Sequence, residues 1–156
     1  MILSKLCYLQ RDEQMLMLLR NKKQVDVNAG KWIGVGGKFL PGESPEECVV
    51  RETFEETGLT LDAMTLRGLL TFASEGWEDE CIFVFVSNAF HGEQKVCDEG
   101  ELRWIPKDQI LDLNLWEGDR IFLKLLLEDD AFFSLKLSYI GDALVEQKLH
   151  VYPKKA

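Results

Sequence analysis

The stretch that decides the fold is GKFLPGESPEECVVRETFEETGL, which runs from Gly37 to Leu59. Within it, Ser44 and Glu47 form an S-x-x-E capping box, and a proline occupies the first helical position between them. Gly58 suits the left-handed residue that commonly ends a helix. The stretch therefore predicts a polar loop followed by a helix from Pro45 to Thr57.

Three glutamates of the predicted helix share one face. At about 100° per residue, Glu52, Glu55 and Glu56 lie within an arc of about 100°. Carboxylates at this spacing repel one another, and hard oxygen ligands beside an open loop suit Mg²⁺ or Mn²⁺. The residues alone also allow a solvated acidic face. The adjoining side of the helix is expected to pack on the core through Val49, Val50, Thr53 and Phe54.

Glycines and lysines flank this stretch. Gly36 and Gly37 permit close approach by a phosphate or a metal ion. Lys38, next to these glycines, can meet a phosphate, as can Lys22 and Lys23 earlier in the chain. Each of the three lysines can equally be a solvated surface residue.

Composition indicates one domain spanning residues 1–156, because 156 residues with 46% hydrophobic content suffice for one sizeable core. The net charge of -9 disfavours binding to polymeric nucleic acid, although metal ions can let an acidic protein bind a nucleotide. The four cysteines are widely spaced and are expected to be reduced, without zinc. No apolar run has the length of a signal peptide or membrane span, so we expect a cytoplasmic protein without membrane contact.

Hydrophobic periodicity predicts strands interrupted by two helices, and hence a mixed sheet between helical layers. The two helices are the one described above and a second expected at Gly118–Leu127, and a short helix is expected besides them at Pro106–Leu111. The strands are expected at Ile2–Leu9, Met15–Leu19, Trp32–Val35, Leu66–Ala73, Cys81–Val86, Leu102–Ile105, Phe132–Tyr139 and Ala143–Val151.

The stretch also matches the pattern G-x5-E-x7-R-E-U-x-E-E-x-G-U, in which U is a bulky aliphatic residue. It therefore resembles the Nudix hydrolase superfamily, and nearly the whole chain resembles the MutT-like 8-oxo-dGTP diphosphatases, including the Gram-positive bacterial form. Outside the box, LLRNKK (18–23), GKWIGVGGK (30–38), CDEGELRWIP (97–106) and LWEGD (115–119) carry the resemblance. Thr53 departs from the aliphatic residue usual at its position, which is expected to cost a little stability. The fixed positions are Gly37, Glu43, Arg51, Glu52, Glu55, Glu56, Gly58 and Leu59.

This resemblance implies an α/β/α sandwich with a mixed β-sheet and a hydrolase that attacks a nucleoside triphosphate with water, releasing the monophosphate and pyrophosphate. It implies a pair between Arg51 and Glu43 that fixes the loop on the helix. Glu52 is the first choice for the general base, and Glu99 is its competitor, although Glu99 can also be an ordinary acidic loop residue. The metal ligands that it implies are the carbonyl of Gly36 with Glu52, Glu55, Glu56 and Glu99.

For the base of the nucleotide, the resemblance indicates Trp116 as a stacking residue and Asp119 as a hydrogen-bonding residue. The alternative is that Trp116 packs under the following helix while Asp119 caps its start. Ile33 stands where some relatives have an asparagine, and it lacks the paired hydrogen bonds of an amide. Other nucleoside triphosphates therefore stay open as substrates.

Two further alternatives remain at this point. One is hydrolysis of ADP-ribose or another nucleoside diphosphate derivative. The other is a nucleotide-binding module without turnover, which the loss of a box glutamate would have favoured; all are present. The sequence leaves a homodimer open.

Overall fold

The computed structural model describes residues 1–22, 26 and 28–153 of the chain. Its helices are α1 (Pro45–Thr57), the 3₁₀-helix η1 (Lys107–Asp112) and α2 (Glu117–Glu128). Its strands are β1 (Ile2–Arg11), β2 (Gln14–Leu19), β3 (Trp32–Ile33), β4 (Val35–Lys38), β5 (Leu59–Ser74), β6 (Glu80–Gly92), β7 (Glu101–Pro106), β8 (Phe132–Ile140) and β9 (Ala143–Tyr152).

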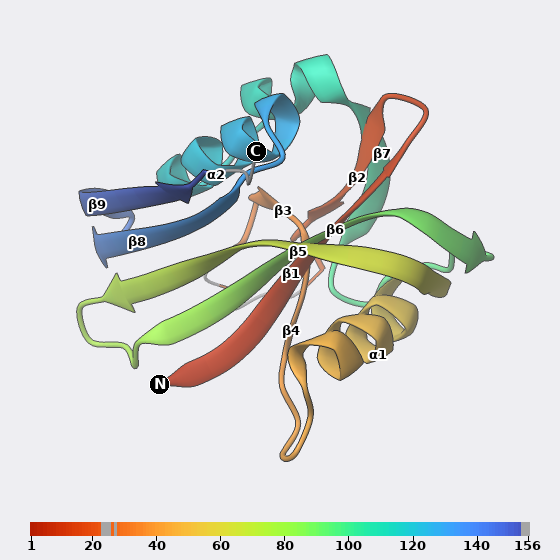
Figure 1. Cartoon of the computed structure of the whole chain (residues 1–156), viewed down its shortest axis with the longest axis horizontal. Coiled ribbons are helices and arrows are strands. Elements are labelled where there is room, and N and C mark those ends of the chain that lie inside the picture. The colour runs from red at the N-terminus through yellow and green to blue at the C-terminus, as the bar shows by residue number, and fades with distance from the viewer. Residues whose placement is uncertain (23–25, 27, 154–156) are drawn as a thin grey trace.

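The strands form one mixed sheet with α1 and α2 on opposite sides (Figure 1). Along the sheet the order is β3-β2-β1-β6-β5-β8-β9, with β4 added to β1 and β7 to β2. The pairs β1–β6 and β5–β8 are parallel, and the remaining pairs are antiparallel. This arrangement confirms the predicted mixed sheet between helical layers.

Alternation along β1 divides the core in two, because successive side chains of a strand point to opposite faces. Cys7 and Leu9 pack with Val49 of α1. Tyr8 packs on the other face, against Phe122 of α2. The sheet is therefore buried on both faces around β1. β1 also borders the loop that leads to α1.

Helix α1 has the predicted boundaries and caps. The Ser44 side chain accepts from the Glu47 backbone N–H at 3.1 Å, and the Glu47 carboxylate accepts from the Ser44 N–H at 3.0 Å. Gly58 ends the helix with φ 80°. The expectation that Phe54 faces the core is wrong, because its side chain is 53% exposed. The buried stripe runs instead through Cys48, Val49, Thr53 and Thr57, and Phe54 lies about 60° beyond its edge at Thr57.

Several strands differ from the prediction. β5 starts at Leu59, directly after the helix-ending glycine, rather than at Leu66. Register shifts in its pairing with β6 interrupt the alternation of apolar residues, which hid this first half. The single strand expected over Trp32–Val35 is two strands that pair with different partners, β3 with β2 and β4 with β1.

The last two strands, β8 and β9, form an antiparallel hairpin, and β9 forms the edge of the sheet. In Figure 1, this edge lies across the molecule from α1. Within the described ranges, no helix combines the length and apolar character needed to cross a membrane.

Candidate active site

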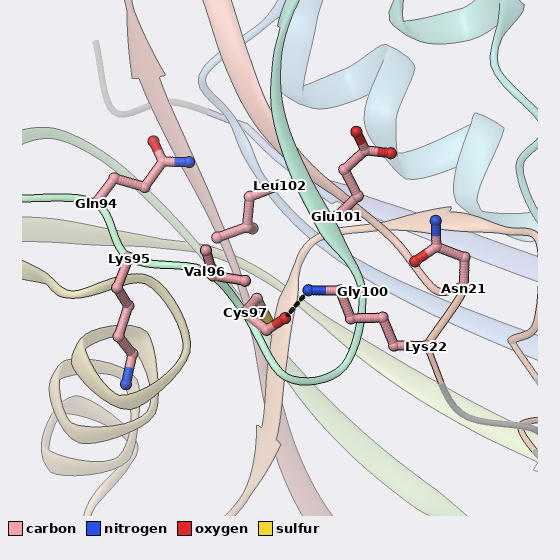
Figure 2. A pocket seen from close by; sticks show the side chains of 9 residues that line it. All are labelled: Asn21, Lys22, Gln94, Lys95, Val96, Cys97, Gly100, Glu101 and Leu102. Carbon is pink, nitrogen blue, oxygen red and sulfur yellow. Dashed lines mark hydrogen bonds between the residues drawn. The ribbon is translucent and has the colours of Figure 1, made fainter.

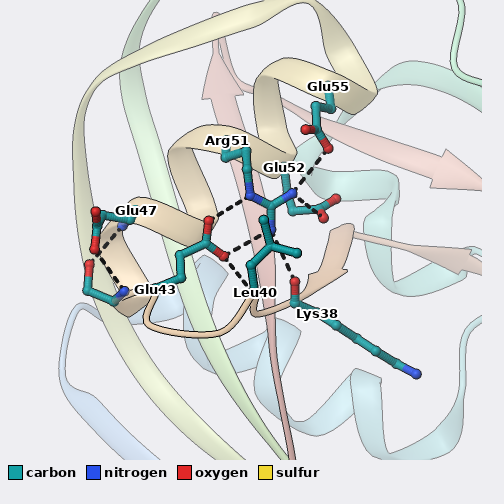
Figure 3. Close-up of polar contacts among 8 residues, drawn as sticks. Lys38, Leu40, Glu43, Glu47, Arg51, Glu52 and Glu55 are labelled. Carbon is teal, nitrogen blue, oxygen red and sulfur yellow. Dashed lines mark hydrogen bonds and ion pairs between the residues drawn. The ribbon is translucent and has the colours of Figure 1, made fainter.

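The guanidinium group of Arg51 ties the loop to α1 (Figure 3). Its Nε and Nη2 donate to the two carboxylate oxygens of Glu43 at 2.6 and 2.9 Å, and Nη2 also donates to the backbone carbonyl of Lys38 at 3.2 Å. Nη1 turns to the acidic face of the helix and donates to Glu52 at 2.8 Å and to Glu55 at 3.2 Å. The pair expected between Arg51 and Glu43 is thus present, and the same cation offsets charge on the acidic face.

These contacts shift the pKa values of both partners. The hydrogen bond from Arg51, followed by one from the Leu40 backbone N–H, lowers the pKa of Glu43 to about 2. The hydrogen bond to Glu43 raises the pKa of Arg51 above its ordinary value. Both groups are therefore charged at neutral pH, and the loop is held by an ion pair.

Gly37 lies directly against the carboxylate of Glu52. Its φ is 150°, and a Cβ atom added there would come within 2.5 Å of Cγ and Cδ of Glu52. Any side chain at this position would displace the glutamate that we expect to act as base. At Gly36 the nearest atoms would lie 3.8 Å from an added Cβ, so the space there does not exclude a side chain. What we expect Gly36 to contribute is its backbone carbonyl.

Glu56 is held by a residue from the loop between β6 and β7. The Sγ of Cys97 donates to its Oε2 at 3.0 Å. Cys97 is buried, and burial together with the bond to Glu56 raises the pKa of the thiol to about 11, so the thiol stays protonated. The Lys95 backbone N–H donates to the Thr57 carbonyl at 2.8 Å. The loop therefore closes over the carboxyl-terminal part of the acidic face.

A cavity of about 490 Å³ opens beside this loop (Figure 2). The Nζ of Lys22 donates to the Cys97 carbonyl at 2.7 Å. Lys22 therefore lines the cavity and is hydrogen-bonded to another of its lining residues. Neither Trp116 nor Asp119 lines this cavity. The lining residues are Asn21, Lys22, Gln94, Lys95, Val96, Cys97, Gly100, Glu101 and Leu102.

Glu99 comes from the same loop but meets a partner from the end of β2. Its Oε2 accepts from Nη1 of Arg20 at 2.8 Å, and Arg20 also pairs with Asp26 at 2.7 Å. Lys23 lies outside the described residues. The side chain of Lys38 extends away from the Arg51 network (Figure 3).

The acidic side chains are not gathered around one point. Among the residues that the structure describes, no group of three or more His, Cys, Asp or Glu side chains is placed to hold a metal ion. Glu52 and Glu55 are drawn to Arg51, and Glu56 is held by Cys97. Their hard oxygen atoms fit Mg²⁺ or Mn²⁺ chemically. These contacts use one oxygen atom of each carboxylate, and the second oxygen of each is able to coordinate such an ion.

Trp116 lies where the chain enters α2 and is packed on several sides. Its Nε1 donates to Oδ1 of Asn28 at 2.8 Å, and its ring meets Tyr139 edge-on at 5.6 Å between ring centres. The Nζ of Lys31 lies 5.0 Å from the ring centre, a cation–π contact. Trp116 therefore packs on Tyr139 of β8 and on residues 28 and 31 with part of its surface, and the side chain stays partly exposed.

Asp119 lies in the first turn of α2, with its backbone N–H bonded to the Trp116 carbonyl at 3.0 Å. The interpretation of Asp119 as a helix cap is wrong, because Trp116 is the capping residue and the Gly118 backbone N–H in this turn donates to the Tyr139 hydroxyl at 2.8 Å. Burial raises the pKa of the Asp119 carboxyl to about 7, and the Lys31 ammonium opposes this shift. An aromatic ring, a cation and a carboxyl group that titrates near neutrality thus lie together.

Three residues that hold parts of the site were not predicted from the sequence. They are Arg20, which pairs with Glu99, Cys97, which holds Glu56, and Lys5. Lys5 is 1% exposed, and its Nζ donates to the carbonyl of Val35 at 2.9 Å. Burial lowers the pKa of Lys5, and the nearby carboxylate of Glu52 is among the groups that oppose the shift. Its only signal in the sequence is the two-residue spacing from Cys7, which places both side chains on one face of β1.

The chain is similar to known proteins over most of its length. The NUDIX domain family matches residues 4–126. The oxidized purine nucleoside triphosphate hydrolase of Danio rerio is 33% identical over 151 residues, which cover 96% of each chain. The Mus musculus protein of the same name is 32% identical over 116 residues, or 74% of each chain. The crystal structure of a MutT protein from Bacillus halodurans superposes with a TM-score of 0.86 and 30% identity, covering 96% of this chain and 97% of that one. The chain therefore belongs to the Nudix family, as a MutT-like hydrolase.

Proposed function

We propose that this protein is a divalent-metal-dependent nucleoside triphosphate pyrophosphohydrolase that acts on 8-oxo-dGTP or a related oxidised purine nucleotide. Its role would be to remove damaged nucleotides from the pool used for DNA synthesis and repair. The observation that carries the proposal is the network in which Arg51 holds the loop against the glutamates of α1. The names of the Danio rerio and Mus musculus relatives support the substrate class.

Mg²⁺ is the proposed cofactor, with Mn²⁺ as a substitute. When bound, such an ion neutralises phosphate charge and orients the phosphates. The proposed ligands supply only oxygen donors, which these ions prefer. They are the Gly36 carbonyl and the carboxylates of Glu52, Glu55, Glu56 and Glu99.

The products define the bond that breaks. Release of a monophosphate and pyrophosphate requires water to cleave the bond between the α- and β-phosphates, and the water must lose a proton. Glu52 is the proposed acceptor of that proton, with Glu99 as its competitor, and the Arg51–Glu43 pair fixes the position of Glu52. Glu55 shares the Arg51 guanidinium and completes the proposed catalytic set.

Three lysines are proposed to contact the phosphates. Lys38 follows the glycines of β4, and its exposed amine is able to turn toward a substrate. Lys22 would first have to release the Cys97 carbonyl. Lys23, outside the described residues, is proposed from its position in the sequence alone.

Trp116 and Asp119 are proposed to read the base. The exposed part of the Trp116 ring offers a stacking surface. A carboxyl with a pKa of about 7, as at Asp119, is present in both forms at neutral pH and is able to donate or accept a hydrogen bond. Ile33 is buried with Leu18 and Cys97, so no amide reads the base at that position.

The proposed substrate is a free nucleotide rather than a nucleic acid polymer, and the proposed location is the cytoplasm. The acidic net charge of -9 supports the first point.

The test is a comparison of 8-oxo-dGTP, dGTP, dATP and ADP-ribose in the presence of Mg²⁺, with monophosphate, pyrophosphate and phosphate all measured. The expected result is the highest kcat/KM for 8-oxo-dGTP, with equal amounts of monophosphate and pyrophosphate. A preference for ADP-ribose would instead identify a hydrolase of nucleoside diphosphate derivatives. Tight binding without turnover of any compound would identify a binding module.

A further inference from the structure

Strand β9 leaves a long edge of the sheet without a neighbour. It pairs with β8 on one side only, and its outer N–H and C=O groups face no other strand among the described residues. A row of unpaired backbone groups is a template for another strand. Figure 1 shows this edge at the margin of the molecule, away from α1.

The side chains along this edge are unusually apolar for an exposed strand. Every residue of β9 except Leu144 is exposed. Val145, Leu149 and Val151 have 41 to 55% of their surface accessible. Leu149 and Val151 pair with the buried Leu135 and Phe133 of β8, so they continue the apolar face of the core beyond its present border.

Charges on an edge strand often prevent unwanted pairing, but here they favour one particular arrangement. Glu146 and Lys148 have opposite signs and lie on either side of Gln147. Two antiparallel copies of β9 related by a two-fold axis through Gln147 would place each Glu146 opposite Lys148 of the second copy. The pairing of β9 with β8 shifts by one residue at Val145, so this register is regular over residues 146–148 of each copy and meets the shift on either side of them.

Neighbouring registers are disfavoured. For two sheets to continue into one another, facing residues must point to the same side, so the axis must pass through a residue. An axis through Glu146 would oppose two glutamates, and an axis through Lys148 would oppose two lysines. Like charges directly opposite each other destabilise a strand pair. Gln147 is thus the central position that joins opposite charges.

Charges on the neighbouring strand β8 also favour an axis through Gln147. In the β8–β9 ladder Lys148 lies opposite Lys136, while the Lys136 ammonium pairs with Glu146 at 2.9 Å. Lys148 therefore faces a like charge within its own chain. Glu146 of a second copy would supply an opposite charge on its other side.

We propose that β9 is a self-association surface, through which a second copy of this chain adds its own β9 in antiparallel register about Gln147. The two sheets would then become one continuous sheet. Each α1, with its glutamates, would remain at the far side of its own subunit, so association would leave both hydrolytic sites open.

Charge reversal tests the register directly. In light scattering coupled to size exclusion over a dilution series, the parent should approach the mass of two chains. Lys148→Glu and Glu146→Lys should each raise the dissociation constant by about tenfold or more, because each places like charges opposite one another twice. The double variant Glu146→Lys with Lys148→Glu should restore association, because it exchanges the partners without losing either pair.

The controls separate association from folding and from catalysis. Lys148→Glu removes the like-charge pair with Lys136, so this variant should fold at least as well as the parent. Lys107→Glu makes the same charge change on η1 and should leave the mass unchanged. Turnover of 8-oxo-dGTP should be the same in all these variants, and the mass measurement stands whether or not that substrate is correct.

A cysteine pair checks the central residue. With an added thiol oxidant, Gln147→Cys should form a disulfide between two chains, whereas Val151→Cys, four residues from the axis in each copy, should not. A parent that stays monomeric at every concentration overturns the proposal. A dimer whose dissociation constant is unchanged by both single charge reversals would also overturn it. So would a double reversal that fails to restore association.

Discussion

Cys97 donates a hydrogen bond from Sγ to Oε2 of Glu56 at 3.0 Å, although 41 residues separate the two in the chain. The raised pKa of the thiol keeps this donor neutral, so it orients the carboxylate without neutralising it. Arg51 differs in this respect, because it brings a positive charge to Glu52. Glu52 at one end of the acidic face is thus held by a charged partner, and Glu56 at the other end by a neutral one.

The contact between Cys97 and Glu56 should tune metal affinity. Cys97→Ala is expected to raise the Mg²⁺ concentration that gives half-maximal activity by about tenfold, as is typical when a residue that orients a metal ligand is lost. Cys97→Ser retains a donor and should stay closer to the parent. Activity titrations with Mg²⁺ check this, and an unchanged titration for Cys97→Ala would contradict it.

Removal of divalent ions should abolish hydrolysis. The clustered glutamates lose their proposed cation, and the phosphate charge is then no longer offset. Treatment with a general chelator should stop pyrophosphate release, and added Mg²⁺ or Mn²⁺ should restore it, while a zinc-selective chelator should have little effect. Full activity after rigorous depletion would argue against the proposed chemistry.

Glu52→Gln should lower kcat by about 10² to 10⁴ fold, the range expected for loss of a general base, with the fold retained. Glu56→Gln should also lower activity severely, because a proposed metal ligand is lost. Glu46→Gln is the matched control, since this glutamate is exposed in the first turn of the same helix. Near-normal turnover by Glu52→Gln at saturating Mg²⁺ would show that the base lies elsewhere, with Glu99 the next candidate.

Trp116 and Asp119 should affect base recognition in different ways. Trp116→Ala is expected to weaken binding of all purine nucleotides, whereas Asp119→Asn should change their ranking by about 1 to 3 kcal/mol, because one hydrogen-bonding pattern is replaced. KM values for 8-oxo-dGTP, dGTP and dATP check this. Thermal unfolding must be measured alongside, since Trp116 also packs on Tyr139. Folded variants with the parental order and KM values would place base recognition near Ile33 and residues 21–31.

Asp119 should also make stability depend on pH. Folding raises the pKa of its carboxyl from 3.8 to about 7 and so favours the protonated form. This contribution to stability is fully present below about pH 4 and is lost as the pH rises through about 7. The Tm of Asp119→Asn relative to the parent should therefore increase from about pH 4 to about pH 8. A difference in Tm that stays constant over this range would show that folding does not raise the pKa of Asp119.

The helix and its loop could be predicted because their signals are local. Ser44, Glu47 and Gly58 act within a few residues of the helix ends, and Arg51 meets Glu43 eight residues away. The expected orientation of Phe54 is wrong because one step of about 100° along the helix, from the buried Thr53, leads to a solvent-exposed position.

Other parts of the site depend on contacts between distant segments. Arg20 meets Glu99 across 79 residues, and Lys5 meets the Val35 carbonyl across 30. Such pairs follow from the order of the strands in the sheet, which hydrophobic periodicity does not determine. The extra length of β5 was also hidden, because its register shifts break the two-residue repeat on which strand prediction relies.

The buried amine of Lys5 makes it a chemical reporter of transient opening. A reagent that acylates amines should modify exposed lysines such as Lys124 and Lys148 at once, but it can reach Lys5 only when β1 separates from the structure packed on it. The acylation rate at this single residue would therefore measure how often the layer beneath the catalytic helix opens. Repeating the measurement with and without a divalent ion would show whether the ion changes that frequency.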